Sequence, residues 1–382
     1  MMVKLGEVCT IVSGTTPKST QPEYWDGDLN WVTPAELTEE SNVIYESQRK
    51  ITQQAVIDSS LKSFPAGTVL LSSRAPIGKV AIAGTEMYCN QGFKNLICSE
   101  KIYNRYLYHY LKSKAEYLNS LGRGATFKEI SKAIVENIEI PLPPLAEQRK
   151  IAAALDKVSD LIAKRRQQLT KLDELIKARF VEMFGDEHQF DKWHCTSVGE
   201  IADICVGVVI KPTQYYTDNC GIPAFRSLNI GTMAVKNSDW VYFTKEGHEK
   251  NKKSVIKEND VLVVRSGAPG TACVATKEFE GYNAIDIIIA HPNFEKINPI
   301  FLAMFTNMAH GMNQIRGKTG GAAQQHFNVS GYKSLTVILP PIELQNQFAF
   351  FVEQTEKTKT TISHSLEKLE ILKNALMQEY FG

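Results

Sequence analysis

The chain has 382 residues, more than a single hydrophobic core usually serves, so we expect two or more domains. Its apolar fraction of 43% with 9% aromatic residues is ample for packed cores and argues against a disordered chain. The formal net charge of +1 neither requires nor excludes nucleic acid, so DNA binding would have to rest on local basic patches.

Residues 3–140 alternate short apolar runs with loops, the pattern of a mixed α/β domain. The clearest predicted strands are 69–71, 80–83 and 138–140, and helical spacing predicts a helix over 104–121 that Gly122 ends. The loops between these elements combine Gly or Pro with a cation or an amide. We therefore predict a first domain over residues 1–141 with chemically active loops.

Residues 142–185 predict a long helix. Pro143 and Pro144 disfavour helix before them and admit one after them, and no Pro or Gly follows until Gly185. Apolar residues then recur in alternating steps of four and three, with Arg165 and Arg179 in two of the positions, which is the period of a coiled coil. The predicted seam consists of Ile151, Leu155, Val158, Ile162, Leu169, Leu172, Ile176 and Met183.

The same plan occurs a second time along the chain. Residues 186–338 repeat the first domain with diverged loops, and VLVVRSGAPG (261–270) echoes the strand and loop that end in SSRAPIG (72–78). Residues 339–382 repeat the long helix without a gap, 197 residues later, from Leu142/Leu339 to Gly185/Gly382. An internal repeat of this kind predicts two similar halves.

This order predicts an α+β fold in which two similar mixed α/β domains are separated by two long helices. If the helices pair as an antiparallel coiled coil, the halves are related by a pseudo-twofold axis and the helices act as a rigid spacer. Dimeric DNA readers likewise hold two similar modules at a fixed distance. Here the two modules are fused and free to differ, which fits an asymmetric, interrupted target.

The sequence contains none of the common catalytic signatures. GxGxxG, GxxxxGK[ST], HExxH and GxSxG are missing, and both Pro-Pro pairs precede long helices instead of forming a methyltransferase motif. The histidines show no spacing typical of metal ligands, so we predict no catalytic residues, no metal and no cofactor. Seven cysteines without a CxxC pair or a secretory signal, and no apolar run long enough for a membrane span, predict a cytoplasmic protein with no membrane contact.

Several of these features together resemble the specificity (S) subunit of type I restriction-modification systems. The resemblance rests on PLPPLAEQRKIAAALD (141–156), SSRAPIGKVAI (72–82), NQGFKNL (90–96) and the repeated domain–helix plan, and it covers essentially the whole chain. It implies two target-recognition domains that each read part of a bipartite double-stranded DNA target. It also implies that the helices serve as a spacer and that methyltransferase (M) and restriction (R) subunits join the scaffold.

The candidate DNA contacts are cations and amides of the loops. Arginine can form a bidentate pair with guanine, and glutamine amides suit adenine. The alternative is that each candidate is a solvated turn residue. Arg265 follows an apolar strand, so for this residue a further alternative is a buried structural ion pair. The candidates are Lys18, Arg74, Lys94, Arg123, Lys128, Arg226, Arg265, Arg316, Lys318, Gln324 and Gln325.

The PLPP-headed helix starts carry the predicted contacts to partner subunits, namely Glu147, Gln148, Arg149 and Gln345. The favoured function is a non-catalytic DNA-specificity chain of a multisubunit DNA adenine methyltransferase and restriction endonuclease. Two alternatives stay open, a coiled-coil adaptor that binds only protein and an enzyme with an unrecognised methyltransferase or nuclease site.

Overall fold

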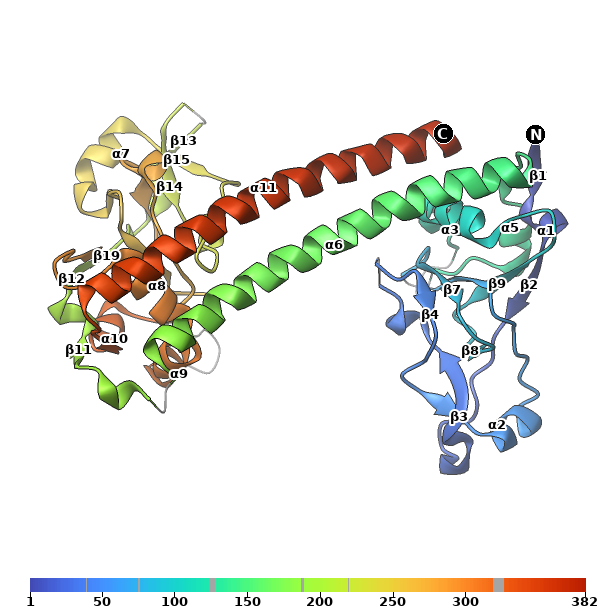
Figure 1. Ribbon diagram of the computed structural model, residues 1–382. Helices are drawn as coiled ribbons and strands as arrows, with labels where there is room; N and C mark the ends of the chain where they lie inside the picture. The colour runs from blue at the N-terminus through green and yellow to red at the C-terminus, as the bar shows by residue number, and fades with distance from the viewer. Residues whose placement is uncertain (39, 75, 124–127, 187–188, 219, 319–325) are drawn as a thin grey trace. The chain divides into compact units, whose positions relative to one another are not determined.

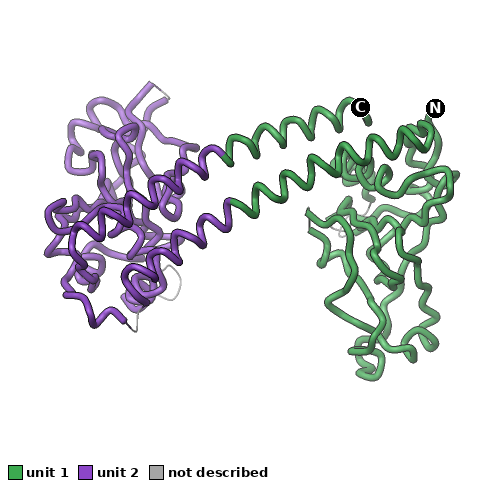
Figure 2. Tube along the Cα trace, in the orientation of Figure 1, with its two compact units in different colours: residues 1–168, 362–382 green, residues 169–361 purple. Residues whose placement is uncertain are grey.

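The computed structural model describes residues 1–38, 40–74, 76–123, 128–186, 189–218, 220–318 and 326–382. The chain forms two compact units, shown in Figure 2. Unit 1 consists of residues 1–168 and 362–382, and unit 2 consists of residues 169–361. Each of the two long helices contributes one part to unit 1 and the other part to unit 2.

Unit 1 contains three sheets, with strand orders β2-β9-β6-β7-β4, β5-β3-β8 and β1-β10. Its strands are β1 Met2–Lys4, β2 Cys9–Ser13, β3 Trp25–Val32, β4 Val43–Ile44, β5 Lys50–Ile51, β6 Val69–Leu71, β7 Val80–Ala83, β8 Tyr88–Cys89, β9 Lys94–Cys98 and β10 Glu139–Pro141. Its short helices are α1 Leu5–Val8, α2 Gln53–Asp58, α3 Asn104–Ser113, α4 Ala115–Ser120 and α5 Lys132–Glu136. The β1-β10 pair joins the first and last strands of the globular part.

Unit 2 has the corresponding sheets, β12-β19-β16-β17, β13-β15-β14-β18 and β11-β20. Its strands are β11 Cys195–Ser197, β12 Ala202–Val206, β13 Tyr216–Thr217, β14 Ile222–Phe225, β15 Val241–Phe243, β16 Val261–Val264, β17 Ala272–Val274, β18 Asn283–Ala284, β19 Ile287–Pro292 and β20 Thr336–Ile338. Its short helices are α7 Lys245–Lys250, α8 Pro299–Asn307, α9 Ala309–Lys318 and α10 Val329–Lys333. The predicted duplication of a mixed α/β scaffold is confirmed.

The central strands are apolar on both faces because each larger sheet separates two cores. In β6, Val69 and Leu71 face one core while Leu70 faces the other. In β16, Val261 and Val263 likewise face the core on the side of the long helices, and Leu262 and Val264 face the second core. Successive residues of a strand point to opposite faces, so a strand buried on both faces reads as a continuous apolar run.

The two long helices have matching bounds. Helix α6 covers Leu145–Phe184 and helix α11 covers Ile342–Phe381, 40 residues each, so both ends of the repeat agree with the 197-residue offset. Figure 1 shows α6 in green and α11 in red. The predicted starts directly after the Pro-Pro pairs are confirmed.

The helices run antiparallel within each unit. In unit 1, Ile151 and Leu155 of α6 share a core with Phe381 near the end of α11. In unit 2, Phe180 and Phe184 of α6 pack against Phe348 near the start of α11, with ring centroids 5.4 and 5.7 Å away. The predicted seam is thus buried at both ends, and Phe180 and Phe184 extend it.

The last phenylalanine of each long helix packs against aromatic residues of a short helix in a globular part. Phe381 contacts Tyr106 and Tyr110 of α3, with centroids 5.4 and 5.5 Å away, and Phe184 contacts Phe301 of α8 at 4.9 Å. Aromatic pairs of this kind add to the hydrophobic gain of burial. The Phe-Gly end that the two copies share therefore fastens each helix to a globular part.

One predicted helix is interrupted, and its counterpart in the second unit is divided in the same way. The helix expected over 104–121 is α3 and α4, which separate at Lys114, and the counterpart is α8 and α9, which separate at Met308. Apolar spacing continues through both breaks, so periodicity alone did not reveal them. The predicted domain boundaries after residues 141, 185 and 338 stay an interpretation, since the compact units divide inside the long helices.

Candidate nucleic-acid interface

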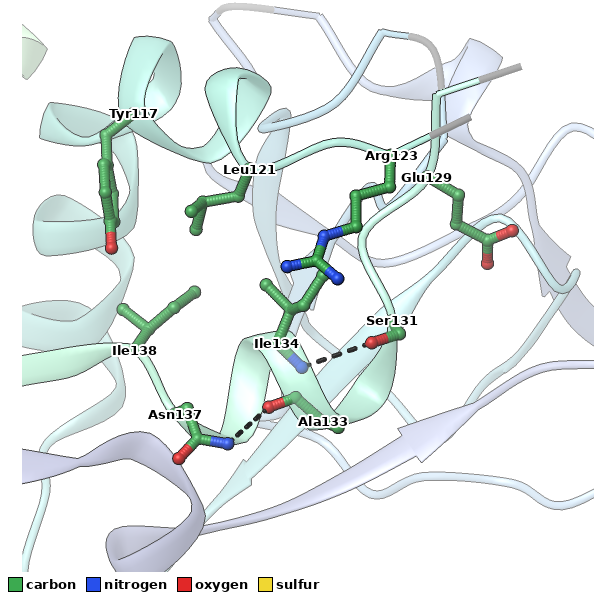
Figure 3. Close-up of a pocket in the computed structure, with 9 residues that line it drawn as sticks. All are labelled: Tyr117, Leu121, Arg123, Glu129, Ser131, Ala133, Ile134, Asn137 and Ile138. Atoms are coloured by element: carbon green, nitrogen blue, oxygen red, sulfur yellow. Dashed lines mark hydrogen bonds between the residues drawn. The ribbon is translucent and has the colours of Figure 1, made fainter. Parts of the chain in front are cut away.

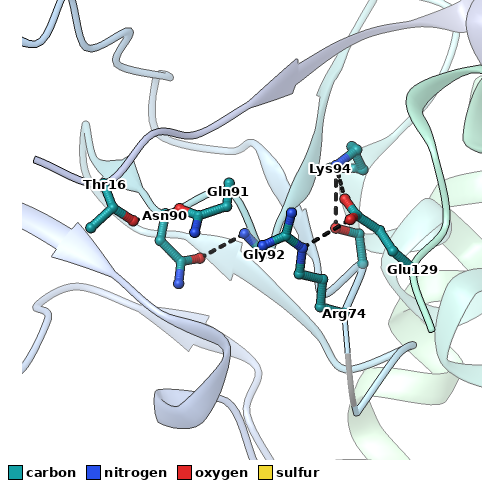
Figure 4. A network of polar contacts seen from close by, with 8 residues as sticks. Thr16, Arg74, Asn90, Gln91, Gly92, Lys94 and Glu129 are labelled. Carbon is teal, nitrogen blue, oxygen red and sulfur yellow. Dashed lines mark hydrogen bonds and ion pairs between the residues drawn. The ribbon is translucent and has the colours of Figure 1, made fainter. Parts of the chain in front are cut away.

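In unit 1, Glu129 joins two of the predicted DNA-binding cations. Its carboxylate accepts a hydrogen bond from Arg74 Nε at 2.9 Å and one from Lys94 Nζ at 3.1 Å (Figure 4). Burial acts to raise the pKa of Glu129, but the bonds from Lys94 and Arg74 outweigh it and hold that pKa below its usual range. Arg74 follows β6, Lys94 begins β9 and Glu129 precedes α5, so the cluster ties three segments together.

Glu129 also closes a loop. Its backbone N–H donates to Arg123 O at 3.0 Å, and Arg123 N–H donates to Glu129 O at 3.1 Å. Arg123 and Lys128, at the two sides of this loop, are exposed. The Glu129 cluster therefore fixes the base of a loop whose flanking cations face solvent.

A hollow of about 490 Å³ borders the same loop (Figure 3). The Arg123 side chain extends into this hollow, over Ile134, whereas the Glu129 carboxylate points away from it. Arg123 is thus directed to a different side of the loop base than the Arg74–Glu129 pair. The hollow is lined by Tyr117, Leu121, Arg123, Glu129, Ser131, Ala133, Ile134, Asn137 and Ile138.

An amide turn lies close to the cluster. Asn90 Oδ1 accepts from the Gly92 N–H at 2.9 Å, and Gln91 Oε1 accepts from the Thr16 hydroxyl, which links the turn to the loop that also carries the exposed Lys18. Figure 4 shows Arg74 between this turn and Glu129. Arg74 remains 44% exposed, whereas Lys94 is 8% exposed. Of the two cations on Glu129, only Arg74 is therefore accessible to a ligand in solution.

Unit 2 holds the equivalent loop base with different chemistry. The bridge between Ser266 and His326 takes the place of the bridge between Arg74 and Glu129. Ser266 Oγ lies 2.7 Å from His326 Nδ1, and His326 Nε2 lies 2.5 Å from the Arg265 guanidinium. A histidine thus stands where unit 1 has a carboxylate.

Arg265 is a buried structural residue. Its side chain is 9% exposed, forms an ion pair with Asp286 at 2.7 Å and donates from Nε to Phe327 O at 3.1 Å. The structure thus supports the alternative of a buried ion pair for this residue. Lys94 is withdrawn from the surface in the same way, so neither side chain is placed to reach DNA.

The other unit 2 candidates differ in their surroundings. The guanidinium of Arg226 donates to Asp239 O, and this side chain is half-buried. Arg316 and Lys318 are exposed at the end of α9, with Lys318 Nζ 2.8 Å from Ser334 Oγ. Gln324 and Gln325 lie outside the described residues. Among the unit 2 candidates that the structure describes, Arg316 and Lys318 thus face solvent.

Two of the predicted partner contacts are internal. Gln148 and Gln345 are both 0% exposed, and each side chain makes the same three hydrogen bonds in its own unit. Gln148 accepts from Tyr103 N at 2.8 Å and donates to Lys101 O and Pro143 O at 3.1 and 2.9 Å. Gln345 repeats this with Asn298 N, Lys296 O and Pro340 O at 2.9, 3.2 and 2.8 Å. These glutamines fasten the helix starts and are not placed to bind a partner, because no part of either side chain reaches the surface.

Their neighbours on α6 do face solvent. Glu147 has 47% of its side chain exposed, and Arg149 is exposed with its guanidinium 5.0 Å from the Tyr103 ring centroid. These two residues remain candidates for a partner surface.

Sequence reasoning missed Glu129 and the role of the glutamines. A pattern of loop cations gives no signal for a carboxylate, although Glu129 is the residue that joins two of these cations. The glutamines carried one usable signal, because both copies keep Gln directly after an otherwise altered residue, Glu147 or Leu344.

Within the described ranges, no three histidine, cysteine, aspartate or glutamate side chains gather as metal ligands would. The helices of the described part include none long and apolar enough to cross a membrane.

Comparison with known proteins places the chain in a family. Its residues 1–172 and 191–371 match the model of the type I restriction modification DNA specificity domain. A specificity subunit from Methanocaldococcus jannaschii, that of the type I enzyme MjaIX, is 28% identical over 98% of this chain and 90% of its own length. The EcoBI specificity subunit of Escherichia coli is 24% identical over 76% of this chain and 68% of its own length.

Solved structures share the fold. The S subunit of a type I restriction-modification system from M. genitalium aligns over 100% of this chain and 96% of its own with a TM-score of 0.62 at 15% identity. A chain from a structural study of type I complex assembly and conformational transition aligns over 100% of this chain and 97% of its own, with a TM-score of 0.58 at 19% identity.

The relatives are named as specificity subunits, which agrees with the prediction of a targeting chain without catalysis of its own. Two matched domain regions, the shared fold and the repeated helix starts lead to one conclusion. This chain belongs to the type I restriction-modification DNA specificity family.

Proposed function

We propose that this chain reads a bipartite, interrupted target in double-stranded DNA, one part with each globular unit, and serves as the scaffold for methyltransferase and restriction subunits. The observation that carries the proposal is the duplication itself. Two units share a scaffold but hold the base of the equivalent loop with a carboxylate in one case and a histidine in the other. Equal scaffolds with unlike loops suit the reading of two unlike half-sites.

The exposed cations supply the expected electrostatic contact. Both units carry exposed cations, namely Lys18, Arg74, Arg123 and Lys128 in unit 1 and Arg316 and Lys318 in unit 2. Lysine and arginine that meet phosphates release counterions and add affinity without sequence preference. Base readout would then come from the loop side chains that the cations position against a groove.

The long helices suit the scaffold role. Their matched bounds and antiparallel course within each unit provide two similar helix starts, each fixed by a buried glutamine. The starts differ on the surface, because Glu147 and Arg149 of α6 correspond to Leu344 and Asn346 of α11. We propose that M subunits contact these starts, and that the two copies are not used equally.

Exchange of one globular part tests the DNA-reading role. Residues 198–335 are replaced by the corresponding segment of a family member, so that the β11-β20 pair remains intact, and methylated adenines are mapped in cells that contain the partner subunits. We expect one half of the methylated sequence to change while the other half and the gap persist. The matched exchange of residues 5–138 changes the opposite half.

Unchanged methylated sites after both exchanges would instead favour a protein adaptor that does not read DNA. The purified chain supplied with a methyl donor and DNA but without M subunits is expected to transfer no methyl group. Turnover under these conditions would contradict the non-catalytic role.

A further inference from the structure

Unit 2 contains a cluster of cysteine, histidine and aspartate that none of the preceding roles uses. Cys205 Sγ on β12 lies 3.7 Å from His291 Nε2 on β19, and His291 Nδ1 lies 2.5 Å from Asp260 Oδ1. Asp260 comes directly before β16, so three neighbouring segments of one sheet contribute one side chain each. The linear order of thiol, imidazole and carboxylate is the arrangement in which a cysteine acts as a nucleophile.

The carboxylate of the cluster is enclosed, whereas the histidine and the cysteine are partly exposed. Asp260 is 3% exposed and its second oxygen accepts from Lys257 N at 2.7 Å, which fixes the carboxylate. His291 is 27% exposed, and Cys205 is half-buried on the edge strand of the sheet, with its thiol also 3.3 Å from Lys253 O. A reagent in solution can therefore approach the thiol, while the carboxylate stays protected.

Unit 1 carries other side chains at the positions of these three residues. The strand pairs of the two units correspond. Val12 lies opposite Asn95 in unit 1, as Cys205 lies opposite Ile289 in unit 2. Val69 likewise lies opposite Leu96, as Val261 lies opposite Ala290. By this register, the positions of Cys205, His291 and Asp260 in unit 2 correspond in unit 1 to Val12, Ile97 and Thr68. In unit 1 the apolar Val12 and Ile97 thus stand where unit 2 has the cysteine and the histidine, which are polar groups that are costly to bury.

The imidazole of His291 lies between the carboxylate of Asp260 and the thiol of Cys205. The hydrogen bond from His291 to Asp260 is the main cause that raises the pKa of His291 to about 9, with a further contribution from Cys205 against the effect of burial. At neutral pH His291 is therefore an imidazolium, and its Nε2–H faces the sulfur. An N–H in this position can donate a hydrogen bond to the sulfur as it attacks, and the thiolate is the nucleophilic form of cysteine.

We propose that Cys205, His291 and Asp260 form a thiol-modification site at which Cys205 exchanges with low-molecular-weight disulfides. The Cys205 thiolate attacks one sulfur of the disulfide, and a new S–S bond forms as the old one breaks. The departing sulfur takes the bonding electron pair and then the proton that Cys205 has lost. The disulfide is the only oxidant consumed, and the product is a mixed disulfide on β12.

The wild-type chain contains its own reference thiols. Cys195 and Cys220 are exposed, more than Cys205, and belong to the same unit. The full chain is treated with oxidised glutathione at neutral pH, and mixed disulfides are located by peptide mass spectrometry over time. We expect the adduct at Cys205 to form about tenfold faster than at Cys220 despite its lower exposure. Formation at Cys205 no faster than at Cys220 would overturn the proposal.

Substitution of His291 tests whether the histidine, and not only the exposure of the thiol, sets the rate of adduct formation at Cys205. His291→Gln is expected to slow the adduct at Cys205 about tenfold and to leave the rate at Cys220 unchanged. The thermal unfolding curve of the variant shows whether unit 2 remains folded, and the wild-type comparison of Cys205 with Cys220 is decisive if it does not. A folded variant with an unchanged Cys205 rate would show that His291 does not activate the thiol. The outcome is independent of whether the chain reads DNA.

Discussion

At the scale of single residues, one buried glutamine fastens each long helix to the segment that precedes a short helix of the same unit. Gln148 and Gln345 bond to the same three kinds of backbone group at nearly equal distances. Buried backbone groups that lose their partner cost more than the bond itself contributes. The glutamine of PLPPLAEQ is therefore retained in the second copy for the fold.

Gln148→Ala should lower the free energy of unfolding of unit 1 by roughly 2–4 kcal/mol, because it leaves one N–H and two carbonyl groups unpaired inside the protein. The matched control is Gln167→Ala, an exposed position on the same helix, with an expected change within about 0.5 kcal/mol. Denaturant unfolding of both variants provides the comparison. Similar free energies of unfolding for the two variants would show that the hydrogen bonds of Gln148 do not stabilise the start of α6.

The His291–Asp260 pair should make the stability of unit 2 depend on pH. The folded-state pKa of His291 is raised from 6.5 to about 9, so the contribution is complete below pH 6.5 and is lost as pH rises toward 9. Because His291 is 27% exposed, we expect a difference on the order of 1–2 kcal/mol. The free energy of unfolding of the wild type and of His291→Gln is measured below pH 6.5 and near pH 9. An equal pH dependence of this free energy in the two proteins would disprove the contribution of the pair.

Lys128 is expected to meet a DNA phosphate. Lys128→Gln should weaken binding to all sequences alike and reduce the slope of log affinity against log salt by about one. Lys132→Gln, in an exposed ion pair with Glu136 in the same unit, serves as control and should leave the slope unchanged. Binding titrations over a range of salt concentrations decide, and an unaltered slope for Lys128→Gln would make it a solvated turn residue.

At the scale of elements, a glycine in each unit lets the sheet that contains β2 or β12 come into backbone contact with a second sheet of that unit. A Cβ on Gly14 would lie 2.0 Å from Cys89 O, and one on Gly207 would lie 2.5 Å from the carbonyl carbon and oxygen of Ala284. Both glycines directly follow an edge strand, β2 or β12. The shared Gly at this point of the two copies therefore permits backbone contact between sheets.

Gly207→Ala should lower the free energy of unfolding of unit 2 by at least about 2 kcal/mol, because backbone must move to admit the methyl group. Gly317→Ala is the matched control in the same unit. Its Cβ would meet nothing within 4 Å, and alanine favours the helix α9 in which it lies. Thermal unfolding distinguishes the two, and equal melting temperatures would contradict the close approach.

The helices also differ between the copies in their polar contacts. Lys359 of α11, where α6 has Ile162, forms an ion pair with Asp173 at 2.6 Å in unit 2, and Arg166 of α6 pairs with Glu370 at 2.9 Å in unit 1. Polar residues in or beside a seam can fix helix register at a cost in stability. The apolar seam alone would leave the register of the two helices less well specified.

At the scale of the whole molecule, we propose that helix length sets the unread gap of the DNA target. Insertion of one heptad after Gln168 and another after Thr361 preserves the seam period and adds about 10 Å at 1.5 Å per residue. That corresponds to about three base pairs of duplex at 3.4 Å each. Mapping of methylated adenines should show both half-sites unchanged and a gap longer by that amount.

Insertion into α6 alone is the control, because it breaks the pairing of the helices and should abolish methylation instead of lengthening the gap. A gap of unchanged length after the double insertion would rule out the helices as the spacer.

Much of the fold followed from local sequence patterns. The proline pairs, the uninterrupted coiled-coil period and the ungapped repeat determined two equal helices, and the apolar runs at 69–71 and 261–264 determined central strands, because backbone geometry and burial periodicity act over a few residues. Ordinary loop composition likewise pointed to Arg74, Arg123, Lys128, Arg316 and Lys318, which proved to be exposed.

What local patterns could not decide was which polar side chains meet. Glu129 lies 55 positions from Arg74, and Asp260 lies 31 positions from His291, so these contacts depend on how strands pair. Burial of Lys94, Arg265, Gln148 and Gln345 depends on the same long-range packing. The sequence therefore determined the scaffold and its duplication, and only the tertiary structure separated the accessible cations from those enclosed by their own ion pairs.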